Sequence, residues 1–209
     1  MGHREDLLAG AKRCLYERGY ARTTARDIVA ASNTNLASIG YHFGSKEALM
    51  NEALFEAIGE WGQEIEHALG SAVGTSDDAG VRFETYWTKV LESFGTHRQL
   101  WAASFEVFAQ VDRVPEIRAM IAEGIRDARL SWAELLQGID SSTDRARAEA
   151  VGSIYQALLT GMMVQWLVDP QHTPSAAALT DGLRVIAQSI RPADGAGSND
   201  VPHGDSDQV

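Results

Sequence analysis

Residues 20–50 of the chain read YARTTARDIVAASNTNLASIGYHFGSKEALM. Thr24 stands three residues before Asp27, which is the spacing of a capping box at the start of a helix. Apolar residues recur at helical spacing up to residue 31, and the polar residues 32–34 end this first helix. A second short helix is predicted from Asn35 to Tyr41 or His42. Two short helices joined by a turn of about three or four residues form a helix-turn-helix unit, whose second helix enters the major groove of DNA.

The remainder of the chain also has a helical pattern. Apolar residues repeat at steps of three and four, and no long stretch alternates with a period of two. Polar or glycine-containing breaks separate these stripes, near residues 19–20, 44–45, 70–80, 96–97, 112–115, 138–143 and 169–174. We predict an all-α protein of about nine helices. Residues 1–50 form a three-helix head, residues 51–190 a helical body, and residues 191–209, which are poor in apolar side chains, a disordered tail.

Length and composition exclude several classes of protein. The chain has 209 residues, 44% of them hydrophobic, which is too apolar for a wholly disordered chain. A single cysteine, Cys14, leaves no disulfide within the chain and no CxxC metal or redox site. We find no run of 18 apolar residues and no apolar leader after Met1, so the prediction is a cytoplasmic protein without a membrane partner.

Charge is divided unevenly along the chain, whose formal net charge is −11. Residues 1–50 carry seven Lys or Arg and five Asp or Glu, for a balance of +2. Residues 51–209 carry 11 basic and 24 acidic residues, for a balance of −13. A small basic head on an acidic body can contact DNA phosphates even though the whole protein is acidic.

Signatures of catalysis are absent from the sequence. The six histidines are scattered without HExxH or other metal-ligand spacing, and the chain has no GxSxG, Walker or GxGxxG motif. Cys14 falls on the apolar stripe of the first helix, as a core cysteine does. We therefore predict no enzyme, no metal and no cofactor; a small-molecule enzyme is the third-ranked interpretation.

One family resemblance follows from the residues of the helix-turn-helix region. Thr23-Thr24-x-Arg26-Asp27-Ile28-x-x-Ala31, followed by Ser38-Ile39-x-Tyr41-His42-Phe43-x-Ser45-Lys46-Glu47-x-Leu49, resembles the TetR family of transcriptional regulators. The resemblance implies a three-helix DNA-binding head and a larger helical body that binds a small molecule and dimerises. Two positions depart from the family pattern: Asn33 replaces a turn glycine, and Gly40 replaces a larger residue such as Tyr. Asn tolerates the left-handed conformation that such a turn requires.

The resemblance also implies which head residues contact DNA. Those expected to hold phosphates are Thr24, Tyr41, His42 and Lys46, with Arg26 reaching a phosphate or a base. Those expected at base edges are Thr34, Asn35, Leu36, Ala37 and Ser38. Asn35 could pair bidentately with adenine, and Leu36 or Ala37 could contact a thymine methyl group. Taken singly, each has a purely structural interpretation as a cap, turn or core residue.

Aromatic and methionine side chains of the body have two interpretations, a helical core or the wall of a ligand cavity. The residues predicted to bind the ligand are Phe83, Trp87, Trp101, Phe105, Phe108, Met120, Trp132, Tyr155, Met162 and Trp166. Few charges are expected to face this cavity, with Thr88, Ser104, Gln110, Gln156 and Gln165 as its polar groups. The predicted ligand is a moderately hydrophobic, uncharged or weakly charged organic molecule.

Residues 148–168 are apolar nearly all round, so the predicted helix is buried on more than one side. Gly152 and Gly161 could let a partner backbone approach closely. With residues 175–190 this helix is expected to form a four-helix interface in a homodimer that reads a palindromic operator. The family's usual mode is a repressor released from double-stranded DNA by a small hydrophobic ligand. The sequence leaves open a ligand-responsive activator or a sensor that contacts another protein.

Overall fold

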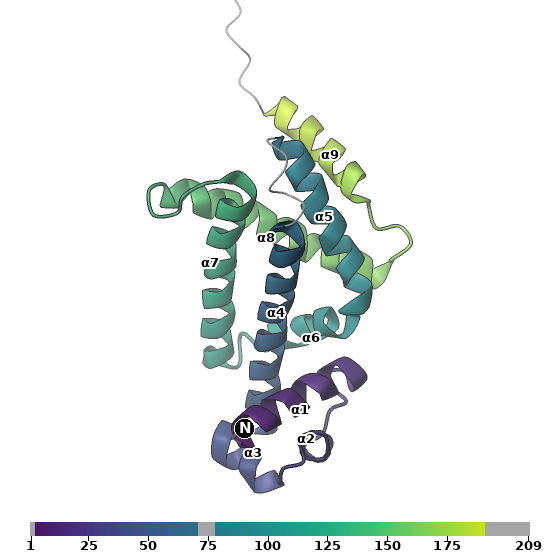
Figure 1. Ribbon diagram of the computed structural model, residues 1–209, viewed down its shortest axis with the longest axis vertical. Coiled ribbons are helices and arrows are strands. Elements are labelled where there is room, and N and C mark those ends of the chain that lie inside the picture. Colours follow the sequence, from purple (N-terminus) through teal and green to yellow (C-terminus); the bar gives the residue numbers. More distant parts are fainter. Residues whose placement is uncertain (1–2, 71–77, 191–209) are drawn as a thin grey trace, which may run out of the picture.

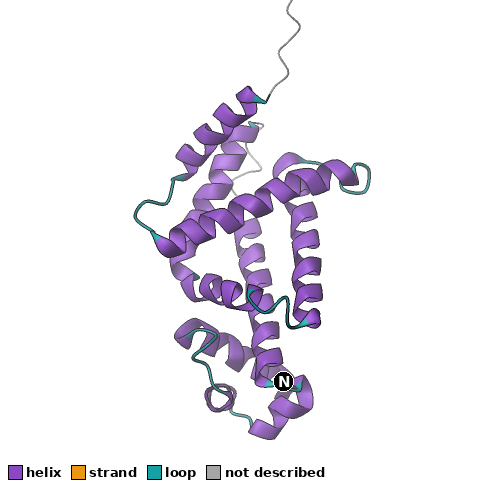
Figure 2. Cartoon of the chain, turned by 180° about the vertical axis from the view of Figure 1, so that it is seen from behind, coloured by secondary structure: helices purple, strands orange, loops and turns teal. Residues whose placement is uncertain are grey.

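The computed structural model describes residues 3–70 and 78–190, and this part of the chain is helical without a strand (Figure 2). Its helices are α1 (His3–Arg18), α2 (Ala25–Ser32), α3 (Leu36–Phe43), α4 (Lys46–Gly70), α5 (Ala79–Thr96), α6 (Arg98–Phe108), α7 (Pro115–Gln137), α8 (Arg145–Val168) and α9 (Ala176–Ser189). The all-α class and the predicted number of about nine helices are confirmed within these ranges. Most of the predicted 70–80 loop and the predicted disordered tail lie outside the described residues.

Helices α1, α2 and α3 form the lower end of the molecule in Figure 1 and pack around a small apolar core. Leu7 and Leu15 of α1 are fully buried, and Ile28 of α2 and Ile39 of α3 meet them there. Leu49, at the start of α4, is also fully buried in this core. Apolar contacts on the inner side thus hold the helix-turn-helix unit together, and the side chains of its outer side are not needed for this core.

Helix α4 runs from this head into the rest of the molecule (Figure 1). Its first turns bury Met50 and Ala53, and its later turns bury Trp61 and Ile65. The predicted domain boundary at residue 50 therefore lies inside one continuous helix. A continuous helix resists bending, so the head and the walls of the body share a rigid element.

The body is built from α5 to α9, with α8 crossing α7 and α9 lying on α5 (Figure 1). Gly152 of α8 lies against the backbone of Arg129 on α7, where a Cβ atom would be 2.6 Å from the Arg129 Cα. The close approach predicted for Gly152 thus occurs within the chain, between α7 and α8, and not to a partner. A Cβ at Gly161 would have nothing within 4 Å.

Candidate DNA-binding surface and ligand cavity

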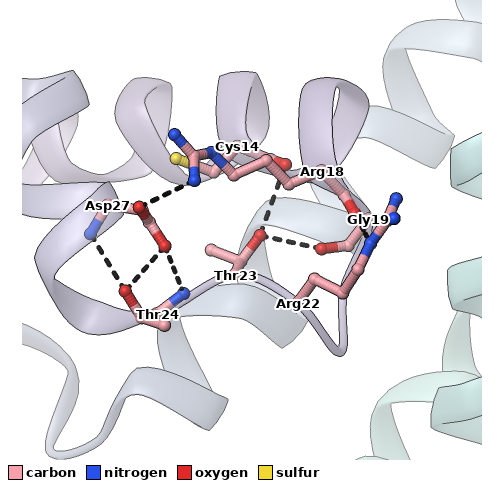
Figure 3. A network of polar contacts seen from close by, with 7 residues as sticks. All are labelled: Cys14, Arg18, Gly19, Arg22, Thr23, Thr24 and Asp27. Atoms are coloured by element: carbon pink, nitrogen blue, oxygen red, sulfur yellow. Dashed lines mark hydrogen bonds and ion pairs between the residues drawn. The ribbon is translucent and has the colours of Figure 1, made fainter.

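The start of α2 is fixed by the capping box that the sequence predicted (Figure 3). The Asp27 backbone N–H donates to Thr24 Oγ1 at 3.2 Å, and the Thr24 backbone N–H donates to Asp27 Oδ2 at 2.9 Å. Arg18 of α1 pairs with the other Asp27 oxygen at 2.9 Å. The hydrogen bonds from the Thr24 side chain and backbone, together with Arg18, lower the pKa of Asp27. This carboxylate therefore ties α2 to α1 in its charged form.

The turn between α2 and α3 has the conformation that its sequence requires. Asn33 is the C-cap of α2 with φ +53° and ψ +41°, the left-handed region expected there. The hydroxyls of Ser32 and Thr34 lie 2.7 Å apart within the turn. Asn33 therefore fills the place where the family pattern has glycine.

Helix α3 begins at Leu36, one residue later than predicted, because Asn35 is its N-cap. The Asn35 Oδ1 accepts a hydrogen bond from the Ser38 N–H at 3.0 Å. Asn35 thus has a local structural role, and any base contact would have to use its Nδ2 donor and the remaining lone pair of Oδ1. The helix ends at Phe43, so its predicted end at Tyr41 or His42 was one or two residues early.

One face of α3 is open to solvent and another is buried. Leu36 is 53% exposed and Tyr41 85% exposed, and Ala37 and Gly40 lie exposed between them. Ile39, on the inner face, is only 5% exposed. The exposed face of α3 thus carries two large side chains, Leu36 and Tyr41.

Three other predicted DNA-binding residues lie on α2, α3 and α4. Arg26 is exposed on α2 and has no ion-pair or hydrogen-bond partner in the described part of the chain. Lys46 is half-buried: its Nζ donates to the Thr23 carbonyl at 3.2 Å and lies 3.4 Å from Glu47. His42 is half-buried with its ring edge against Tyr41. Lys46 is therefore held in place, whereas Arg26 is exposed and without a partner in the described part of the chain.

A cavity of about 590 Å³ opens between α4 and α7 in the body. Its walls come mainly from these two helices, and α5, α6 and α8 contribute fewer residues, among them Tyr86, Trp101 and Leu159. Most of its lining is apolar or aromatic. A cavity of this size and character suits a small organic molecule.

Ten side chains were predicted to bind the ligand, and the structure places only part of them at the cavity. Trp101, Phe108, Met120 and Trp132 line it. The other six do not: Phe83, Trp87, Phe105, Tyr155, Met162 and Trp166. Trp87 is fully buried, and Phe83 packs its ring against Trp87 and Tyr155. Helical phase explains four of the six, because Trp87, Phe105, Tyr155 and Met162 each lie one position from a residue that lines the cavity.

Helix α4 lines the cavity, although none of the predicted ligand-binding residues lies on it. Phe55, Ile58, Gly59, Gly62 and Glu66 line the cavity from this helix. They share one helical face, and a Cβ at Gly59 or at Gly62 would have nothing within 4 Å. Glycine in the interior of a helix lowers its stability. The two glycines could therefore have indicated from the sequence that this face of α4 borders open space.

Charge at the cavity also differs from the sequence-based prediction of few inward charges. Glu66 of α4 and Glu123 and Asp127 of α7 line it, and its lining contains no Lys or Arg. Ser104 and Gln156, two of the five predicted polar groups, are also in the lining. All three carboxylates are exposed, so they lie where the cavity meets solvent. No group of three or more His, Cys, Asp or Glu with the arrangement of a metal site occurs in residues 3–70 and 78–190.

Polar contacts join the head to the helix that forms the cavity wall. Lys12 of α1 lies 2.6 Å from Glu56 and 2.5 Å from Glu60 of α4. Tyr20 donates to Asn51 of α4 at 2.6 Å, and this pair is buried. Glu56 and Glu60 lie between cavity-lining residues in the sequence of α4, such as Phe55, Ile58 and Gly62. The same two turns of α4 therefore contact the head on one side and line the cavity on another.

Models of two known families match the chain. Residues 7–53 match the bacterial regulatory proteins of the tetR family, and residues 78–189, more than half of the chain, match the tetracyclin repressor-like C-terminal domain. The first match covers the helix-turn-helix head, and the second covers α5 to α9.

Individual proteins agree with the family models. The transcriptional repressor AcnR of Corynebacterium efficiens is 41% identical over 46 residues, which are 22% of this chain and about a quarter (24%) of AcnR. A TetR transcription regulator from Haloarcula marismortui has the same fold, with a TM-score of 0.61 and 16% identity over 89% of this chain and 95% of that one. The multidrug binding protein EbrR, solved with proflavin, gives a TM-score of 0.58 and 20% identity over 88% of this chain and 99% of EbrR. With its head and its body each matched by a model of the family, the chain belongs to the TetR family of transcriptional regulators.

Proposed function

We propose that the protein is a cytoplasmic transcriptional repressor that binds a palindromic operator as a homodimer and is released by a small organic ligand. The observation that carries this proposal is the exposed face of α3, formed by Leu36, Ala37, Gly40 and Tyr41 and fixed at both ends by caps. A rigid, exposed second helix of a helix-turn-helix unit is suited to the major groove. Arg26 of α2 and Lys46 of α4 would supply positive charge for phosphates, in a head whose balance is +2.

The homodimer is supported by apolar side chains that this chain leaves uncovered on α8, on α9 and at the C-cap of α9, Ile190. The most exposed are Ile154, Val168, Val185, Ile186 and Ile190, with exposures from 55% to 80%. By length and mean hydropathy α8 would also suffice for a membrane-spanning helix, but a core helix passes the same test, and α8 packs against α7. A second copy of α8 and α9 would cover these apolar surfaces and present two heads to two half-sites.

Release by a ligand is supported by the position of α4. One side of this helix carries the pairs to Lys12 of α1, and another side lines the cavity through Phe55, Gly59 and Gly62. A ligand that prefers a different separation of α4 and α7 would tilt α4 and with it the head. In a dimer, heads at the wrong separation do not fit adjacent major grooves, so the ligand shifts the population away from DNA.

The proposal is tested by selecting DNA sites from a random pool with the purified full-length protein, followed by mobility-shift titration on the selected site. We expect a palindromic sequence whose half-sites lie about one helical turn apart. Ala37→Glu places a negative charge on the exposed face of α3 and should abolish binding, whereas Glu134→Gln on α7 should leave it unchanged.

Regulation is measured separately, with a reporter placed downstream of the selected site. Repression that a ligand relieves supports the full proposal, and increased transcription on binding would replace the repressor by an activator. Recovery of no enriched sequence, with a protein that is folded and dimeric by light scattering, would contradict the proposal.

A further inference from the structure

The charge lining the cavity is entirely negative. Glu66 lies on α4, and Glu123 and Asp127 lie one turn apart on α7. None of the three has an ion-pair or hydrogen-bond partner in the described part of the chain. The basic side chains of α7, including Arg126 and Arg129, are absent from the lining. The cavity therefore presents three uncompensated carboxylates to anything that enters it.

This arrangement is unfavourable while the cavity holds only water. Two like charges at positions i and i+4 of a helix destabilise it by about 0.2–0.5 kcal/mol. Residues 51–209 add a balance of −13, so the surrounding field also repels anions and attracts cations. A positive charge at the mouth of the cavity would relieve this repulsion, and a negative ligand would increase it.

The inner surface adds a second requirement. Trp61, Trp101 and Trp132 line the cavity with Phe108, and aromatic rings bind apolar surface as well as cations. Trp101 is only 2% exposed, and its indole N–H has no acceptor in the described part of the chain. The inner part of the cavity therefore suits the apolar or aromatic part of a ligand.

We infer that the cavity selects organic cations with a largely apolar body, whose positive charge lies among Glu66, Glu123 and Asp127 and whose apolar part lies against the tryptophans. The inference rests on the proposed role of the cavity as the effector site. It changes the predicted ligand class from uncharged or weakly charged organic molecules to organic cations. The same carboxylates repel nucleotides and other phosphate-bearing molecules.

The test uses two ions of the same shape and opposite charge, tetraphenylphosphonium and tetraphenylborate. Each is titrated into the full-length protein without DNA, by calorimetry and by quenching of tryptophan fluorescence. We expect saturable binding of the cation at one site per chain, at least about tenfold tighter than binding of the anion. Equal affinity for the two ions, or tighter binding of the anion, would overturn the inference.

The position of the charge is tested with the triple variant Glu66→Gln, Glu123→Gln, Asp127→Asn. We expect its affinity for tetraphenylphosphonium to fall about tenfold, and its melting temperature to stay the same or to rise because the repulsion is removed. The matched control Glu92→Gln, Glu134→Gln, Glu149→Gln removes three exposed acids that do not line the cavity, and it should bind the cation like the wild type. If both triple variants lose affinity equally, only the net charge of the body matters and the assigned site is wrong.

Failure of this inference is distinguishable from failure of the proposed function. If tetraphenylphosphonium binds with the expected dependence on the three carboxylates but does not release DNA, the ligand class stands and the proposed release is wrong. If a neutral or anionic compound binds in the cavity and releases DNA while the cation does not, the proposed function stands and the cation preference is wrong.

Discussion

The hydroxyl oxygen of Tyr16 lies 3.4 Å from Nδ1 of His97, which joins the first helix of the DNA-binding head to the junction of α5 and α6. On its other side His97 Nε2 lies 3.3 Å from a carboxylate oxygen of Glu64 on α4. With the Nε2–H directed to Glu64, Nδ1 accepts from the Tyr16 hydroxyl. His97 is buried, so α1, α4 and the body meet at one side chain.

Tyr16→Phe should weaken the communication between ligand and operator more than it weakens operator binding itself. It removes only the hydroxyl, so the head should keep its fold and bind DNA within about twofold of the wild type, while the ligand-induced loss of affinity shrinks about three- to tenfold. Mobility-shift titrations with and without a saturating ligand measure both quantities. The control Tyr155→Phe breaks a 2.8 Å hydrogen bond with Gln137 inside the body and should leave the coupling unchanged. An unchanged ligand effect in Tyr16→Phe would show that this hydrogen bond does not carry the coupling.

Arg26→Gln should flatten the salt dependence of DNA binding. Arg26 is exposed and unpaired in the described part of the chain, so removing its positive charge from a phosphate should reduce the slope of log K against log salt by about 0.9. Lys46→Gln should flatten the slope to a similar degree, with a small decrease in stability because its bond to the Thr23 carbonyl disappears. Titrations at four salt concentrations measure the slopes, with Lys89→Gln on α5 as the control. A slope unaltered by Arg26→Gln would place this side chain away from the DNA backbone.

Asn35 is the N-cap of α3 and is also predicted to contact a base, and two substitutions distinguish these two roles. Asn35→Ser keeps a good N-cap, so its stability should match the wild type, but it loses the bidentate amide and with it about 1–3 kcal/mol of discrimination between operator and mismatched DNA. Asn35→Ala should lose about 1 kcal/mol of stability as well. Thermal unfolding and competition with mutated operators measure the two effects. Full discrimination by Asn35→Ser would mean that Asn35 is a cap only.

Gly152 and Gly161 offer a matched pair on α8. Gly152→Ala forces a Cβ against the backbone of Arg129, where no flexible side chain can yield, so it should destabilise the fold by about 1–3 kcal/mol or more. Gly161→Ala has open space and should stabilise by about 0.5–1 kcal/mol through its better helix propensity. Chemical denaturation of both variants at one protein concentration compares them. Equal stabilities would show that α7 and α8 can move apart at no cost.

Gly62→Trp should fill the cavity from the α4 side. A Cβ at this position has nothing within 4 Å, so the indole can extend into the space that the ligand would use, and ligand binding should weaken by at least about tenfold without loss of folding. Calorimetric titration of a ligand known to bind the wild type measures the change. Glu134→Trp places the same side chain on an exposed, non-lining position of α7 and should bind normally. If Gly62→Trp binds the ligand with wild-type affinity, the ligand does not bind in this cavity.

Local sequence was enough to define the helices and the exposed face of the head. Capping residues act on neighbours three positions away, so Thr24 with Asp27 and the hydroxyl of Ser45 mark the starts of α2 and α4 without reference to the rest of the chain. For the same reason Asn33 could be predicted as a left-handed residue. Helices α2 and α3 are only about two turns long, and Ile28 and Ile39 are their buried residues. Once these residues are assigned to the core, the opposite face of each helix must be the exposed one.

The lining of the cavity and the close approach at Gly152 depend instead on how the helices pack in three dimensions. Trp87 and Trp101 have the same chemistry and both fall on apolar stripes, but α5 turns one into the core and α6 turns the other to the cavity. Gly152 meets α7 of its own chain because α7 and α8 cross there. Glu66 lines the same cavity as Glu123 and Asp127 because of the separation of α4 and α7. Such relationships depend on the relative placement of whole helices, which is fixed by the summed packing of all of them and by no local pattern.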